Sequence, residues 1–223
     1  MTMRYRKHHA WRGGGSIRTW LLLGLLILCA LGAGAWPWVH RPSAAPADIQ
    51  ESGRRIIATE LANLNHTGFG ASERGRCLLA EAESLLRQNR IVFSAGLGER
   101  RGVTWSGWWG PSVVFIRVIE MNNGRYLHQL PSQVVESLFH EALHSVKGTL
   151  SSACFEEECD AFTAGLSAEY ASRGLEPPGV LRIDGTSIAA FVEASYPNAR
   201  RDRDYRPVGA PLEWLCRQAG MNP

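Results

Sequence analysis

The sequence predicts an α+β domain, because helical and strand patterns occupy separate stretches of the chain. Apolar residues recur every three or four positions over 48–65 and 73–88, which indicates two amphipathic helices. Short runs rich in Val, Ile, Phe and Thr follow between 91 and 128 and indicate strands. The helical period then returns from residue 131. This segregation is typical of α+β folds, and we expect a small antiparallel sheet with flanking helices.

Length and composition allow one folded domain with appendages. The chain has 223 residues, of which 45% are hydrophobic and 20% charged, as in ordinary globular proteins. The net charge is +3, but the first 18 residues carry five Lys and Arg and no acid, so the remainder is near −2 (three minus five). Because a nucleic-acid-binding protein carries its basic residues on the folded domain, nucleic acid is not an expected partner.

A long apolar run follows the basic start. Residues 1–18 are polar and Gly-containing, and we expect a basic cytoplasmic tail there. Residues 19–39 carry no charge, and at about 1.5 Å per residue they can span the roughly 30 Å hydrocarbon core of a bilayer. Positive charge before the run predicts a cytoplasmic N-terminus and an exported remainder. Residues 40–47 are the expected linker, and 48–223 the expected domain.

A cleaved signal peptide is the alternative for the apolar run. Its apolar centre would be 21–31, and Ala33-Gly34-Ala35 would supply a cleavage site between small residues. We favour a retained signal-anchor because the run has full spanning length. Both interpretations export the domain, and cleavage would make it a secreted protein.

The β region and the helices after it are defined by periodicity and turn residues. Strands are expected at 91–93, 103–105, 113–119 and 126–128, the last two joined by an Asn-Asn-Gly turn. Helices are expected at 131–148, 153–172, 186–195 and 212–218. The Trp- and Gly-rich segment 105–111 is either a packing loop or a lip that faces substrate.

The most informative motif is His-Glu-Ala-Leu-His at 140–144, inside an expected helix. Helix positions four apart lie on the same face, so His140 and His144 can each give a nitrogen to one tetrahedral Zn²⁺. Glu141 can act there as general base toward water. The motif alone arises by chance in roughly one chain of this length in a few hundred. The assignment of a zinc site therefore also depends on the residues of the following helix.

A catalytic zinc site needs a third protein ligand, and the next helix offers several acids. If the two helices pack antiparallel, Glu156 comes level with His144. Asp160 lies four positions beyond Glu156 on the same face and can support a ligating imidazole by a hydrogen bond. This spacing favours Glu156 as ligand and Asp160 as its support. Glu157 is the alternative, because Asp160 is also three positions beyond it.

The two motifs together resemble those of gluzincin zinc metallopeptidases, His-Glu-x-x-His on one helix and Glu-x-x-x-Asp on the next. They are most similar to the compact minigluzincin core shared with membrane-associated prenyl-protease-like peptidases. The resemblance implies that His140, His144 and Glu156 bind zinc, that Glu141 is the catalytic base and that Asp160 supports the ligands.

The resemblance also implies that the strand at 113–119 is an edge strand, which pairs with an extended peptide substrate. It does not identify the residue that stabilises the tetrahedral intermediate. Tyr126, Tyr196 and Tyr205 are the candidates for that role. Among the remaining histidines, His128 is the one most expected near the site.

Four cysteines follow the apolar run, namely Cys77, Cys154, Cys159 and Cys216. An exported domain could form up to two disulfides from them, and the alternative is four buried thiols. Cys154 and Cys159 point about 140° apart on one helix, so they are not expected to bond each other. No Cys-x-x-Cys occurs, which argues against a thiolate zinc site.

These observations favour a zinc-dependent endopeptidase, anchored in the cytoplasmic membrane, that acts on extracytoplasmic proteins or peptides. The alternative is a binding or assembly protein that keeps the zinc-peptidase core but cleaves little. The short chain, and the absence of an evident residue for stabilising the intermediate, motivate that alternative.

Overall fold

The computed structural model describes residues 41–105, 111–148 and 154–208. The expected tail, the apolar run 19–39, most of the Trp-rich segment and the expected helix 212–218 lie outside these residues. Among the helices of the described residues, none is both long enough and apolar enough to cross a membrane.

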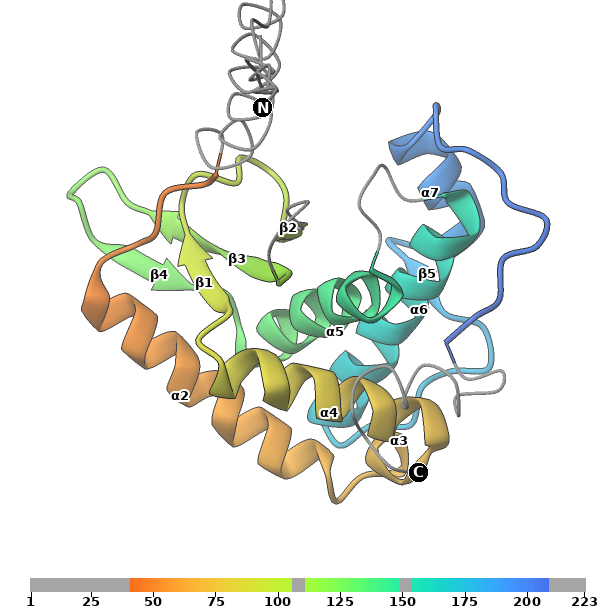
Figure 1. The fold of residues 1–223 in the computed structure, drawn as a ribbon, viewed down its shortest axis with the longest axis horizontal. Helices are drawn as coiled ribbons and strands as arrows, with labels where there is room; N and C mark the ends of the chain where they lie inside the picture. The colour runs from red at the N-terminus through yellow and green to blue at the C-terminus, as the bar shows by residue number, and fades with distance from the viewer. Residues whose placement is uncertain (1–40, 106–110, 149–153, 209–223) are drawn as a thin grey trace, which may run out of the picture. The chain divides into compact units, whose positions relative to one another are not determined.

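The described residues form helices, then strands, then helices again, which confirms the α+β class (Figure 1). The helices are α2 (Ala47–Leu64), α3 (Gly68–Ala71), α4 (Glu73–Arg87), α5 (Pro131–Lys147), α6 (Phe155–Ser172) and α7 (Ile188–Ser195). The strands are β1 (Ile91–Ser94), β2 (Gly102–Trp105), β3 (Val113–Glu120), β4 (Tyr126–His128), β5 (Arg182–Ile183) and β6 (Thr186–Ser187). The short helix α3 and the β5–β6 pair were not expected from the sequence.

The main sheet is mixed rather than antiparallel, which corrects the expectation. Its order is β1-β3-β2, and β4 also pairs with β3. β1 runs parallel to β3, whereas β2 and β4 run antiparallel to it. The sheet is mixed because β2 does not form a hairpin with β1. It lies on the opposite side of β3 from β1. Periodicity identifies each strand, but it carries no information about this order.

The strand β3 is central, which corrects its expected place at an edge. It lies between β1 and β2, and it also pairs with β4. Val114, Phe115 and Ile116 in its middle are fully buried. A strand flanked on both sides has no free backbone groups for an extended substrate. Among the described strands, β2 is the one that lies at the sheet edge next to α5.

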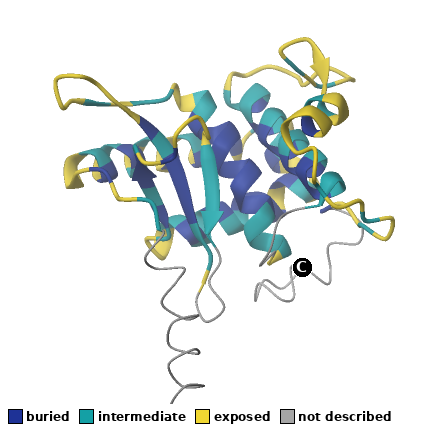
Figure 2. Cartoon of the chain, turned by 90° about the horizontal axis from the view of Figure 1, so that it is seen from above, coloured by how far each residue is buried: buried dark blue, intermediate teal, exposed yellow. Residues whose placement is uncertain are grey.

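Helix α5 is the centre of the hydrophobic core. It contacts α2, α4 and α6 as well as β2 and β3, and every residue from Val134 to Leu143 is buried (Figure 2). A helix that is buried on all sides must also bury its polar residues. His140 and Glu141 therefore lie inside the protein rather than on its surface.

Small side chains allow α6 to approach α5 closely. The buried face of α6 contains Ala161, Ala164, Gly165 and Ala168, whereas the larger apolar residues Phe162 and Leu166 are only partly buried. A Cβ on Gly165 would lie 2.6 Å from the backbone oxygen of Glu136 in α5. The helices are therefore in contact at the backbone near the middle of α6.

We predict that Gly165→Ala destabilises the protein by about 1–3 kcal/mol, because the new methyl group must push α5 and α6 apart. Thermal unfolding should show a decrease in Tm of several degrees. The matched control is Gly68→Ala, since a Cβ there meets nothing within 4 Å. A decrease in Tm of equal size in both variants would contradict close helix contact at Gly165.

Candidate metal centre

Helix α5 holds the two histidines of the motif one turn apart. It begins at Pro131, directly after the N-cap residue Leu130. It ends at Lys147, and the C-cap residue Gly148 has a left-handed φ of 64°. The ring nitrogens Nε2 of His140 and Nε2 of His144 lie 3.3 Å apart. The two imidazoles therefore present their nitrogens to one point, as the spacing predicted.

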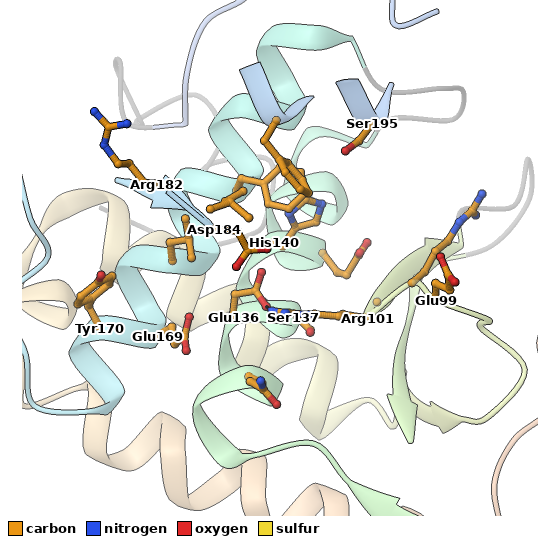
Figure 3. A pocket seen from close by; sticks show the side chains of 18 of the residues that line it. Glu99, Arg101, Glu136, Ser137, His140, Glu169, Tyr170, Arg182, Asp184 and Ser195 are labelled. Carbon is orange, nitrogen blue, oxygen red and sulfur yellow. Dashed lines mark hydrogen bonds and ion pairs between the residues drawn. The ribbon is translucent and has the colours of Figure 1, made fainter. Parts of the chain in front are cut away.

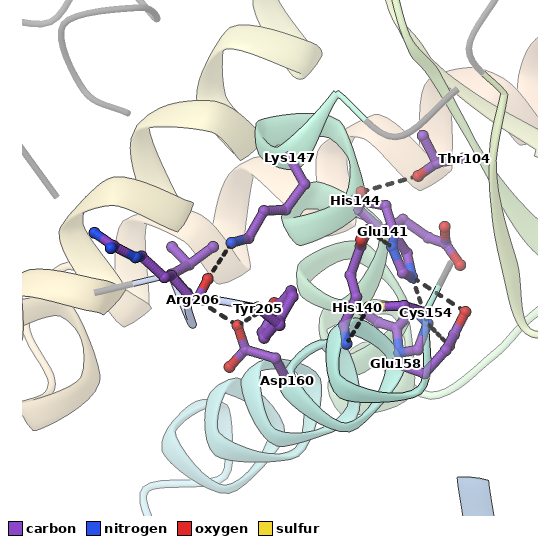
Figure 4. Close-up of polar contacts among 12 residues, drawn as sticks. Thr104, His140, Glu141, His144, Lys147, Cys154, Glu158, Asp160, Tyr205 and Arg206 are labelled. Carbon is purple, nitrogen blue, oxygen red and sulfur yellow. Dashed lines mark hydrogen bonds and ion pairs between the residues drawn. The ribbon is translucent and has the colours of Figure 1, made fainter. Parts of the chain in front are cut away.

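The carboxylate next to these nitrogens belongs to Glu158 (Figure 4). Its Oε2 lies 3.6 Å from His140 Nε2, and its Oε1 lies 3.8 Å from His144 Nε2. His140, His144 and Glu158 thus form a candidate metal-binding cluster in which the three ligand atoms lie within 4.8 Å of one another.

Glu156, which the sequence pattern favoured, lies elsewhere. Its Oε2 accepts a hydrogen bond of 2.8 Å from the backbone nitrogen of Asp202. The carboxylate beside the two imidazoles is therefore Glu158 rather than Glu156, and Glu156 as a metal ligand remains a prediction that this geometry does not favour. The physical reason is the rotation of α6 about its axis, because residues two apart on a helix point about 200° apart. The sequence does not determine that rotation.

The cluster fits a divalent ion by its geometry and by its donors. Ligand atoms about 2.0–2.1 Å from a tetrahedral metal lie roughly 3.3 Å from each other, close to the 3.3 and 3.6 Å measured here. The buried Glu158 Oε2 has no hydrogen-bond partner among the described residues. Because an unpaired buried carboxylate oxygen is costly, a cation at this point would satisfy it.

Glu157 contacts the ring nitrogen of His144 that faces away from the cluster. Its Oε1 lies 2.8 Å from His144 Nδ1, so Nδ1–H donates and Nε2 keeps its lone pair for a metal. Burial lowers the pKa of His144, but the Glu157 hydrogen bond and the charges of nearby glutamates outweigh burial and raise it overall. Glu157, the alternative ligand of the sequence pattern, thus has the supporting position expected for Asp160.

Asp160 of α6 does not take that supporting position. It binds residues of the chain that follows α7. Its carboxylate accepts hydrogen bonds from the Tyr205 hydroxyl at 2.8 Å and from the Val208 nitrogen at 3.0 Å. Arg74 of α4 forms an ion pair with it at 2.7 Å. Burial, followed by the charge of Asp160, raises the pKa of Tyr205. The described partners of the Asp160 carboxylate are therefore Tyr205, Val208 and Arg74 rather than an imidazole, and its supporting role at a metal remains a prediction that this arrangement does not favour.

Glu141 is buried beside His140, and strand β2 lies against it. The Thr104 hydroxyl donates a 2.9 Å hydrogen bond to the Glu141 backbone oxygen. A Cβ on Gly102 would lie 2.9 Å from Glu141 Cγ, so only glycine fits there without moving the side chain. Sequence reasoning missed Gly102 and Thr104, because contacts between a strand and a distant helix leave no local pattern.

Tyr196 is the candidate tyrosine that lies at the cluster. It lines a cleft of about 790 Å³ together with His140, Glu141 and Gly102. Figure 3 shows this cleft with His140 labelled. Burial, followed by the charges of Glu158 and Glu141, raises the pKa of Tyr196 to about 12. The phenol is therefore protonated at neutral pH and can donate a hydrogen bond into the cleft.

The other two candidates from the sequence lie in β4. Burial raises the pKa of Tyr126, and so does the neighbouring Glu120 of β3. His128 Nε2 lies 2.8 Å from the Ser52 hydroxyl of α2, and its ring packs edge-on against Phe93. Neither residue lines the cleft.

The cysteines near the cluster are thiols. Cys154 and Cys159 are free, as their spacing predicted, and the Cys154 sulfur caps α6 by accepting a hydrogen bond from the Glu157 nitrogen. Burial raises the pKa of both thiols. Cys77 is buried, and Cys216 lies outside the described residues, so the predicted number of disulfides remains a prediction.

Comparisons of the chain with protein-family models, with curated proteins and with solved structures found no match.

We predict that Glu158→Gln lowers the affinity for zinc by more than the roughly 100-fold that loss of a supporting residue causes. The matched variant Glu156→Gln should bind zinc as the unchanged protein does, because its amide oxygen can still accept the Asp202 hydrogen bond. Titration against a zinc chelator of known affinity measures both. Loss of zinc in the Glu156 variant alone would contradict the geometry.

Proposed function

We propose that this protein is a zinc-dependent peptidase whose ligands are His140, His144 and Glu158 and whose general base is Glu141. The single observation that carries the proposal is the placement of a buried carboxylate, Glu141, beside the candidate metal cluster and on the wall of a cleft. A purely structural metal site has no use for such a group, and zinc in such sites usually has four protein ligands.

The donor set by itself is compatible with more than one chemistry. Two histidines and one carboxylate hold zinc in hydrolases and ferrous iron in some oxygenases. Glu141 favours hydrolysis, because a carboxylate next to the first histidine can take a proton from an attacking water. The helical His-Glu-x-x-His motif places the base and the two ligands on one rigid element.

The residues around the cluster have distinct roles in this proposal. When bound, zinc supplies Lewis-acid polarisation of the scissile carbonyl. Glu141 accepts a proton from water and later donates it to the leaving amine. Tyr196 donates a hydrogen bond to the oxygen on which negative charge develops. Glu157 holds His144 in the tautomer that keeps Nε2 free of a proton.

A peptide is the substrate that the cleft favours. β2 borders the cleft through Gly102, and within the described residues β3 is its one pairing partner. The other edge of β2 can therefore pair with an extended peptide by strand addition. This replaces β3, which the resemblance implied, by β2 as the strand next to substrate.

We further propose that residues 19–39 anchor the protein in the cytoplasmic membrane and place the cleft outside, where extracytoplasmic proteins or peptides are its substrates. The support is the uncharged spanning-length run after a basic tail. A binding or assembly role without cleavage is the alternative. The position of Tyr196 on the cleft wall argues against it, because the hydroxyl can act as the hydrogen-bond donor that the tetrahedral intermediate requires.

We predict that Glu141→Gln keeps zinc but lowers peptide hydrolysis by about 10²–10⁴-fold, the usual worth of a general base. The assay is digestion of a broad peptide mixture by the full chain in detergent, with and without a chelator. Zinc content of the same samples is the control. Full activity in the variant would refute the mechanism, and absence of chelator-sensitive cleavage in the unchanged protein would refute the function.

We predict that Tyr196→Phe lowers kcat by about 100-fold with little change in KM, because one hydrogen bond to the transition state is lost. Zinc affinity should not change. Tyr126→Phe, which removes a hydroxyl from a tyrosine outside the cleft, is the matched control. Equal kcat in Tyr196→Phe and the unchanged protein would exclude Tyr196 from the reaction.

A further inference from the structure

The cleft continues beyond the metal cluster into a second sector on the same two helices. Glu136 and Ser137 of α5 line it one turn before His140 and Glu141, and Glu169 of α6 lines it opposite them (Figure 3). A helical turn is about 5.4 Å long. A side chain next to a scissile bond at the metal cluster could therefore reach this sector.

Acidic groups surround this sector. Arg101, the residue before β2, forms a 2.8 Å ion pair with Glu136. Burial lowers the pKa of Arg101, but the hydrogen bond and charge of Glu136 and the charges of Glu169 and Asp184 raise it overall. The Arg101 side chain is 55% exposed, whereas that of Glu136 is 8% exposed. Glu136 is thus more deeply buried than the cation beside it.

Glu169 is the second acidic residue of this sector. Burial raises its pKa, and the charge of Glu136 raises it further, whereas Arg173, Arg101 and a hydrogen bond from Ser132 act in the opposite direction with a smaller effect. A second cation between Glu136 and Glu169 would relieve this repulsion. Arg182, which also lines the cleft, donates a hydrogen bond to the Gly185 oxygen.

An unpaired polar group independently indicates that a ligand binds here. Ser137 is 3% exposed, and its hydroxyl oxygen has no hydrogen-bond partner among the described residues although it lines the cleft. A serine in a helix usually satisfies its hydroxyl with a backbone carbonyl one turn back. A buried hydroxyl without a partner costs about 1–3 kcal/mol, which a bound donor would recover.

We infer that the sector formed by Glu136, Ser137 and Glu169 is a subsite that binds a basic side chain of the peptide substrate. The ammonium or guanidinium group would lie between the two carboxylates and donate a hydrogen bond to Ser137. This inference rests on the proposed function for the position of the scissile bond. It assigns the substrates as peptides that carry Lys or Arg near the cleaved bond.

The test measures binding without hydrolysis. The full-length, zinc-loaded Glu141→Gln protein is titrated with fluorescent peptides that have blocked termini and differ at one position, which is Lys, Arg or norleucine. We expect the Lys and Arg peptides to bind at least about 10-fold more tightly than the norleucine peptide. A norleucine peptide with a free N-terminus is included, and preferential binding of that peptide would overturn the side-chain assignment.

Two variants locate the preference. Adding Glu169→Gln to the Glu141→Gln protein should remove most of the preference for Lys and Arg, and adding Ser137→Ala should reduce it. Adding Glu51→Gln, at an exposed acid of α2, should leave it unchanged. Equal binding of the Lys, Arg and norleucine peptides, or a preference that survives Glu169→Gln, would overturn the subsite.

The same peptides separate this inference from the proposed function. Metal-dependent cleavage of all three peptides at equal rates by the unchanged protein would overturn the subsite but would still support the proposed peptidase function. A preference for Lys and Arg in binding, without cleavage of any peptide, would support the subsite and overturn the peptidase.

Discussion

The backbone contact between α5 and α6 is the constraint on which the rest of the site depends. Gly165 lies so close to the Glu136 oxygen that no side chain fits between them. Because α6 is this near, Glu158 in its first turn reaches the two imidazoles of α5. A larger residue at the contact would separate the helices, and the carboxylate and the histidines would no longer meet.

This arrangement concentrates negative charge inside the protein. Glu141, Glu157 and Glu158 are all buried near two histidines, and isolated buried carboxylates are strongly unfavourable. Part of the cost is offset because Glu157 and Glu158 lie in the first turn of α6, where the helix dipole favours anions. A divalent cation would offset much of the rest, so that metal binding and the stability of this part of the fold are coupled.

The sequence predicted the features that depend on the spacing of residues within one helix. Helix 131–148 and the shared face of His140 and His144 follow from periodicity, and both are present. Glu156 and Asp160 also share a face, as predicted, but that face contacts the chain around residues 202–208 instead of the cluster. Periodicity determines which residues lie together on a helix, whereas the rotation of the helix depends on long-range packing.

The short strand β2 shows how much of the site arises from such long-range packing. The residue before β2 and two residues within it each meet α5 in a different way. Arg101, just before the strand, forms an ion pair with Glu136. Gly102 leaves room for the Glu141 side chain, and Thr104 donates a hydrogen bond to the Glu141 backbone oxygen. This strand and the residue before it thus border both Glu141 and the acidic sector of the cleft. A peptide paired with its free edge would extend past both, so the position of β2 at the edge would couple cleavage to recognition of a nearby side chain.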